Sequence, residues 1–257
     1  MRELIGSFLS NESPFGRLMT WIGVIIATNI MFVLCCMPVV TVGASLGAMY
    51  HVMLRALRSH GQINPFKEFY KGIKANFKQG TIVWLILAGL AVFGYIDVRI
   101  CLQADSPVSM IRYAIYAAGL IVLMIVIFIF PVMAAFKNTL PIIIRSAAYF
   151  GIKNPGRLIV LLFFQVFPLY LTYSDPQMMP LYAFLWVTFG FGAIALLTSR
   201  LLIHDFEKYL PIVDSYGDFI LDDDGNLLMP ENKEISSPEN REKTEEEILE
   251  EMKKLDF

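Results

Sequence analysis

Few residues in this 257-residue chain have the types and spacing that catalysis or metal binding requires. His204-Asp205 is an adjacent base and acid, but no nucleophile lies beside it in the sequence. The run Asp222-Asp223-Asp224-Gly225-Asn226 resembles a calcium loop. With Gly225 at the sixth loop position, however, the first ligand would be Ile220, whose side chain has no oxygen. We therefore interpret the run as a turn.

The cysteines add no metal or redox signature. Cys35, Cys36 and Cys101 lie in or at the end of apolar segments, without the spacing of a zinc site or a disulfide framework. No phosphate-binding loop, dinucleotide fingerprint or nucleophile elbow occurs in the sequence. We expect no catalytic residue, no metal and no cofactor, and hence a protein that is not an enzyme.

Two uncharged polar residues, Asn29 and Gln165, interrupt long apolar segments. At lipid depth such side chains must face protein or water. We interpret both as groups that hydrogen-bond between helices, and the alternative is that they line a path for a solute. No Asp, Glu, Lys or Arg lies centrally in a predicted span, which argues against an ion-coupled transporter.

Composition places these residues in a membrane. Hydrophobic residues make up 56% of the chain, charged residues 17%, and the mean hydropathy is +0.57. A soluble domain has roughly 45–50% apolar residues. The composition predicts an all-α, polytopic transmembrane helical bundle.

The charge is divided between two parts of the chain. Residues 1–204 carry 15 basic and 6 acidic side chains, whereas residues 205–257 carry 6 and 17. The first part is predicted to be the transmembrane domain and the second an acidic cytoplasmic tail, and nucleic acid is not an expected partner. Within the tail, 219–229 has the pattern of a hairpin and 244–254 that of a short amphipathic helix.

Six apolar segments are long enough to cross a hydrocarbon core of about 30 Å. The end of the first segment and most of the second form the stretch Asn29–Tyr50, which is uncharged and broken once, by Pro38. In the alternative interpretation, residues 38–57 lie in the membrane interface, which would leave five spans and an external N-terminus. The predicted spans are Leu18–Met37, Val39–Leu54, Thr81–Ile96, Tyr113–Phe136, Leu158–Tyr173 and Leu181–Ile203.

Basic residues in the connecting segments orient the spans. Six lie between Arg55 and Lys78, and four lie between Lys137 and Arg157, whereas the segment 174–180 has none. By the positive-inside rule the two basic segments are cytoplasmic, and with six spans both termini are cytoplasmic as well.

The first basic segment has an amphipathic pattern. Apolar residues recur at helical spacing and lysines occupy the other face, which predicts a helix lying on the membrane and binding lipid. Docking of a partner protein is the alternative. The apolar residues are Phe66, Phe69, Tyr70, Ile73 and Phe77, and the lysines are Lys67, Lys71, Lys74 and Lys78.

Part of this segment recurs later in the chain. Tyr70-Lys71-Gly72-Ile73-Lys74 and Tyr149-Phe150-Gly151-Ile152-Lys153 differ only at the second position, and each precedes a predicted span. A parallel internal repeat of span, amphipathic helix and span is one interpretation. Coincidence or shared interfacial chemistry is the other.

A row of small residues marks the second predicted span. Gly43 and Gly47 form a Gly-x-x-x-Gly pair, and His51 and Arg55 continue the same face at four-residue steps. Small residues allow close helix packing. We interpret the row as a packing face within the protein, with a partner-binding face and a ligand-lining face as alternatives.

The run Met37–Tyr50, with Pro38-Val39-Val40-Thr41-Val42-Gly43-Ala44 at its centre, is followed by Asn76-Phe77-Lys78-Gln79 at the entry to a span. In these motifs the chain resembles the YesL family of uncharacterised bacterial membrane proteins, over approximately residues 5–205. The resemblance implies a multi-pass protein of the bacterial cell membrane with an accessory role in carbohydrate uptake. It identifies no catalytic residue.

Three hypotheses about function follow. The first is a non-enzymatic accessory component of a carbohydrate (oligosaccharide) ABC importer that contacts the permease or ATPase subunits. The second is an autonomous small-solute transporter or channel with Asn29 and Gln165 along its path. The third is a membrane-anchored scaffold that acts through the acidic tail. The sequence identifies neither the substrate nor the oligomeric state.

Overall fold

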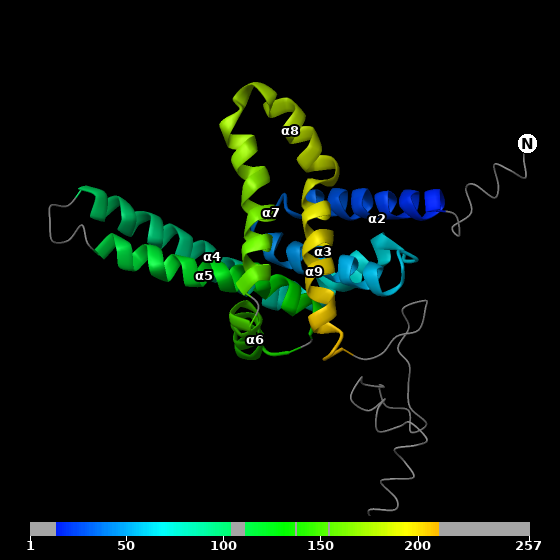
Figure 1. Cartoon of the computed structure of the whole chain (residues 1–257), viewed down its shortest axis with the longest axis horizontal. Helices are drawn as coiled ribbons and strands as arrows, with labels where there is room; N and C mark the ends of the chain where they lie inside the picture. Colours follow the sequence, from blue (N-terminus) through cyan, green and yellow to red (C-terminus); the bar gives the residue numbers. More distant parts are fainter. Residues whose placement is uncertain (1–13, 104–110, 137, 154, 211–257) are drawn as a thin grey trace, which may run out of the picture. The chain divides into compact units, whose positions relative to one another are not determined.

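The computed structural model describes residues 14–103, 111–136, 138–153 and 155–210. The chain divides into two compact units, Met1–Leu201 and Leu202–Phe257, and the packing discussed below lies within the first. The described residues contain helices and no strand, which confirms the all-α prediction (Figure 1). The helical elements are α2 (Pro14–Cys35), η1 (Val39–Thr41), α3 (Val42–Arg58), α4 (Pro65–Gln103), α5 (Ile111–Ala135), α6 (Leu140–Lys153), α7 (Pro155–Ser174), η3 (Pro176–Met178), α8 (Met179–Leu185), the π-helix η4 (Trp186–Gly190) and α9 (Phe191–Phe206).

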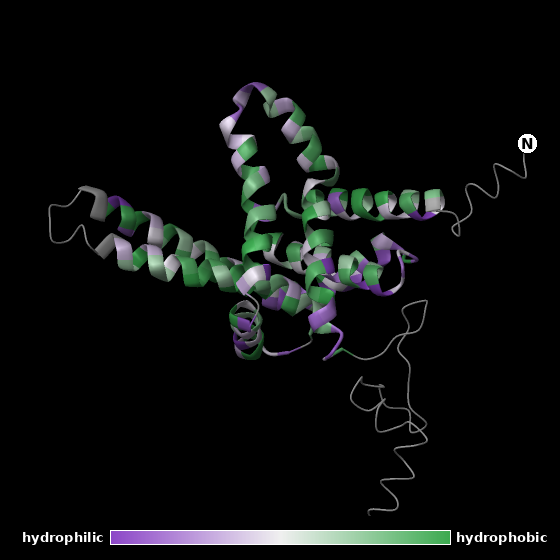
Figure 2. Cartoon of the chain, in the orientation of Figure 1, coloured by the Kyte–Doolittle hydropathy of each residue, from purple (hydrophilic) through white to green (hydrophobic). Residues whose placement is uncertain are grey.

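Six helical segments are long and apolar enough to cross a membrane, as predicted. Apolar residues predominate along α2, α5 and α7 (Figure 2). The chain is therefore a multi-pass membrane protein. The six segments are Phe15–Cys35, Val39–Arg58, Pro65–Ile100, Tyr113–Ala135, Pro155–Ser174 and Pro176–Phe206.

The predicted turn at Pro38 separates the first two of these segments. α2 ends at Cys35, and Pro38 precedes the short helix η1 that leads into α3. The Thr41 hydroxyl lies 2.7 Å from the Pro38 carbonyl oxygen, within hydrogen-bonding distance. Proline cannot donate a backbone hydrogen bond, which accounts for the end of the helix here.

The third span differs from its prediction. Residues 65–103 form the single helix α4, so residues 66–78 are its first turns and not a separate helix. The helix begins where the Asn64 side chain accepts hydrogen bonds from the amides of Phe66 and Lys67, with Pro65 at the first helical position. No proline follows within α4, so nothing interrupts the backbone ladder between the basic segment and the apolar one.

The aromatic face of this segment is also divided. Phe69 is fully buried, whereas Phe66, Tyr70 and Phe77 are exposed. The buried residues of this segment include Phe69, Gly72, Asn76 and Gly80, whereas the four lysines are exposed. Packing against α3, the helix most extensively in contact with α4, accounts for this burial.

The second copy of the repeated sequence adopts a different local structure. Tyr149–Lys153 ends the separate helix α6, and α7 begins at Pro155. The residue that corresponds to Pro155 in the first copy is Asn76, which continues the helix and bonds the Gly72 carbonyl through its side chain. A proline that ends one copy therefore explains why the copies differ in structure.

Candidate functional site

The N-terminal half of α3 crosses α4 with the two backbones in contact. A Cβ atom built on Gly43 would collide with the Gly80 carbonyl oxygen and would lie 2.6 Å from Trp84 Cβ. A Cβ on Gly80 would lie 2.9 Å from Ala44 Cα. Since real Cβ atoms do not approach so closely, only glycine fits at either position, and the crossing depends on both.

The same interface continues toward the C-terminal end of α3. A Cβ on Gly72 would lie 2.8 Å from Ala48 Cα, and one on Gly47 would lie 3.3 Å from Asn76 Cβ and 2.8 Å from the methyl carbon of Met133. Gly43 and Gly47 thus lie against α4 and α5 of the same chain. The row of small residues is a packing surface in this structure, which leaves it unavailable to another protein.

Beyond the glycines, the row ends in a cluster of charges around Glu68. This carboxylate is 7% exposed, and it lies 3.5 Å from His51 Nε2 and 3.9 Å from Arg55 Nε. Lys71 Nζ donates a 2.7 Å hydrogen bond to its other oxygen. His51 and Arg55, which the sequence placed on one helical face, are therefore joined to α4 through a shared anion.

Replacing Glu68 by Gln is expected to lower the free energy of unfolding by about 1–2 kcal/mol. Breaking a fully buried ion pair costs more free energy than this, and breaking an exposed pair costs less. An intermediate value is expected because Glu68 is buried but its three partners are partly exposed. The measurement is the midpoint of thermal unfolding in detergent. Lys71→Gln is the control: its side chain is half exposed, so its loss should have a much smaller effect. Equal effects of the two substitutions would contradict a structural role for the buried carboxylate.

Asn29 connects α2 to the π-helix of the last span. Its Nδ2 donates to the carbonyls of Trp186 at 2.9 Å and Val187 at 2.7 Å, and its Oδ1 accepts from the Gly192 amide at 2.8 Å. A π-helix departs from the i to i−4 pattern, which leaves backbone groups to be satisfied by other partners. The fully buried Asn29 supplies that partner.

Small and aromatic residues complete this contact. A Cβ on Gly192 would lie 3.0 Å from the Ile25 carbonyl oxygen, so glycine allows α9 to approach α2. Phe191 packs on Trp186 at 4.7 Å and on Phe32 at 5.2 Å between ring centroids. Asn29 therefore acts in helix packing and is not available to line a solute path.

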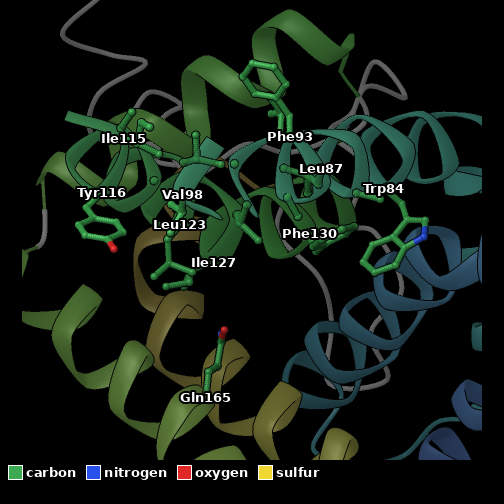
Figure 3. Close-up of a pocket in the computed structure, with 18 of the residues that line it drawn as sticks. Trp84, Leu87, Phe93, Val98, Ile115, Tyr116, Leu123, Ile127, Phe130 and Gln165 are labelled. Carbon is green, nitrogen blue, oxygen red and sulfur yellow. The ribbon is translucent and has the colours of Figure 1, made fainter. Parts of the chain in front are cut away.

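Gln165 has a different environment. It comes from α7 and projects toward a cavity of about 880 Å³ whose other walls are mainly α4 and α5 (Figure 3). Leu87, Phe93 and Ile127 are among the apolar residues that line it. Asn29 and Gln165, for which the sequence suggested the same role, therefore have different environments: Asn29 lies inside a helix contact and Gln165 lies at a cavity.

The remaining predicted residues lie apart from these sites. Ile73 is partly buried on α4, and Lys67, Lys74 and Lys78 are exposed along it. His204 and Asp205 lie in the last turn of α9, in the second unit. The predicted calcium-like turn, hairpin and tail helix fall outside the described residues. Among the residues that are described, no group of three or more His, Cys, Asp or Glu could hold a metal ion.

Comparison with known families gives the chain a partial assignment. Residues 25–98 match the model of a family described as "Protein of unknown function, DUF624". This segment is similar to that family, and the match covers less than half of the chain. The match agrees with the predicted YesL resemblance and extends from the second half of α2 to most of α4. No curated protein and no solved structure matched the chain.

The matched segment contains the glycine crossing, the Glu68 cluster and Asn29. Gln165 and the π-helix lie outside it. Glu68 is the functional group that sequence reasoning missed. Its signal was present, because it is the only acidic residue between Ser13 and Ile96 and lies among six basic ones.

Proposed function

We propose that this chain is a non-enzymatic accessory component of a carbohydrate ABC importer in the bacterial cell membrane. The YesL resemblance suggests this role, and the distribution of buried residues supports it. In the most apolar stretch of the segment that contains α3, 61% of the residues are buried within the chain. In the most apolar stretches of the α4 and α7 segments, only 6% of the residues are buried. The α3 helix is thus enclosed, whereas the most apolar stretches of α4 and α7 are mostly not buried within the chain and can face the bilayer or another protein.

The exposed surface of α7 carries the observation that most favours a protein partner. Phe163 and Phe167 stack at 4.9 Å between ring centroids, and both are exposed, as is Tyr170. Aromatic side chains are enriched at the centres of protein interfaces, where they bury large areas at low entropic cost. An accessory subunit needs such a face within the membrane to contact the importer's permease subunits.

The orientation in this proposal follows from the basic segments. With residues 55–78 and 137–157 on the cytoplasmic side, both termini are cytoplasmic. The acidic tail would then share a compartment with the importer's ATPase subunits. This arrangement allows contact on the membrane side through the helices and on the cytoplasmic side through the tail.

Deleting the chain is expected to reduce uptake of the oligosaccharide that the importer carries, and plasmid-borne wild type should restore it. The measurement is the initial rate of uptake of a radiolabelled oligosaccharide by whole cells. Uptake of a sugar that enters by an ion-coupled symporter is the control and should not change. If deletion leaves the uptake of every oligosaccharide tested unchanged, the proposal is wrong.

An autonomous transporter is the second candidate, and the position of Gln165 at a cavity favours it. Flux of sugars or ions into liposomes that contain only this protein would support it over an accessory role. The scaffold hypothesis predicts instead that removing residues 210–257 abolishes function. Normal uptake by the truncated protein would show that the tail is dispensable.

A further inference from the structure

The cavity beside Gln165 is a space that the packing of the described helices leaves unfilled. Its volume is about 880 Å³, within the range of roughly 300–1,000 Å³ that ligand sites span. The lining residues of α4 and α5 fall inside two of the candidate membrane spans. The cavity therefore lies at membrane depth, where lipid chains or protein helices can enter it.

Gln165 is one of the few polar groups in this mainly apolar lining, and the others are on Asp97, Tyr50, Tyr116 and Trp84. It lies near the middle of α7, and its amide projects toward the open space across from Ile127 (Figure 3). Within the described parts of the chain no hydrogen bond satisfies that amide. An unsatisfied amide in hydrocarbon is costly, so the group requires a partner from outside the chain.

Three kinds of occupant differ in whether they meet this requirement. A lipid chain matches the apolar walls but has no hydrogen-bonding group near the bilayer centre. A sugar could bond Gln165 and the few other polar groups of the lining, but most of the wall is apolar, as at Leu87 and Phe93, so most of its hydroxyls would remain unsatisfied. A transmembrane helix with one polar side chain satisfies both the walls and the amide, as polar residues commonly do between membrane helices.

We propose that the cavity between α4, α5 and α7 receives a transmembrane helix of a partner membrane protein, and that a hydroxyl or amide side chain of this helix hydrogen-bonds Gln165. The proposal rests on the accessory function and names a contact surface for it besides the aromatic face of α7. Under that function, the helix belongs to the membrane-spanning subunit of the importer. Asn29 has no comparable role, because its hydrogen bonds are made within the chain.

Photo-crosslinking in native membranes tests the occupant directly. Leu123 lines the cavity, whereas Leu120, one turn earlier on α5, is exposed but does not line it. With a benzophenone amino acid at position 123, we expect a protein adduct whose linked peptide maps to a membrane span with a hydroxyl or amide residue. The same amino acid at position 120 should give lipid adducts.

Two further variants separate the hydrogen bond from the shape of the cavity. Gln165→Leu should lower the yield of the position-123 adduct by about 3- to 20-fold, the range expected for one hydrogen bond between membrane helices. Gln165→Asn, which keeps the amide, should retain more of it. Ala91→Trp, which fills the cavity, should abolish the adduct, whereas Val92→Trp on the neighbouring exposed position should not.

The possible outcomes distinguish this proposal from the accessory function. Only lipid adducts at position 123, or an adduct to a second copy of this chain, would overturn it even if importer subunits co-purify with the protein. An adduct that is insensitive to both Gln165→Leu and Ala91→Trp would overturn it as well. An adduct within a span of a protein unrelated to import would support the helix site and contradict the accessory function.

Discussion

Replacing Gly43 by Ala should lower the free energy of unfolding by about 3 kcal/mol or more, or prevent accumulation of the folded protein. The added methyl group would collide with the carbonyl oxygen of Gly80, which is backbone and cannot rotate away. Overpacking typically costs about 1–3 kcal/mol, and a clash with backbone belongs at the upper end of that range. The yield of monodisperse protein and its unfolding midpoint in detergent measure the effect.

Gly89→Ala provides the matched control for this prediction. Gly89 lies on α4, as Gly80 does, and a Cβ built on it meets nothing within 4 Å. The free energy of unfolding should therefore be unchanged or slightly higher, because alanine favours helix more than glycine does. If Gly43→Ala proved as stable as Gly89→Ala, the close crossing of α3 and α4 would be wrong.

Replacing Asn29 by Leu should lower the free energy of unfolding by about 2–3 kcal/mol. The substitution removes hydrogen bonds to two carbonyls and one amide around the π-helix, and each group left unsatisfied in a buried position costs about 1–3 kcal/mol. The total loss of free energy is smaller than the sum of these costs, because polar groups in membrane helices find other hydrogen-bond partners when one partner is removed. Thermal unfolding in detergent, followed by tryptophan fluorescence, to which Trp186 contributes, measures the change.

Gln165→Leu is the corresponding control for Asn29. Both substitutions remove an amide from a membrane span, but Gln165 makes no hydrogen bond within the described chain. The stability of the purified protein should therefore be unaffected by Gln165→Leu. Equal losses from the two substitutions would contradict the assignment of Asn29 to helix packing.

The number and approximate positions of the spans could be predicted because they depend on composition summed over about twenty residues. The continuity of α4 could not, because the lysines at its start favour an interfacial helix when the chain is considered alone. What decides the structure is the burial of Phe69, Gly72 and Asn76 against α3. In the sequence, an apolar face that packs on another helix has the same helical spacing as one that contacts lipid, so the pattern does not distinguish the two.

The different environments of Asn29 and Gln165 were also beyond prediction. Asn29 is satisfied by Trp186 and Val187, which lie 157 and 158 residues away in the sequence. No pattern of residue types in the sequence distinguishes the π-helix that supplies these carbonyls from the α-helices beside it. For Glu68, in contrast, charge patterning offered a local clue, since a lone acid among basic residues needs a structural reason.

The account depends most on the proposal that the chain works in complex with an importer. Gentle extraction of the tagged, full-length protein from its native membranes, followed by quantitative mass spectrometry, tests this claim most directly. Permease or ATPase subunits of a carbohydrate ABC importer should be enriched with the wild type, and Ala91→Trp should lose them while Val92→Trp retains them. Recovery of the protein without any importer subunit, under conditions that keep a known importer intact, would contradict the account.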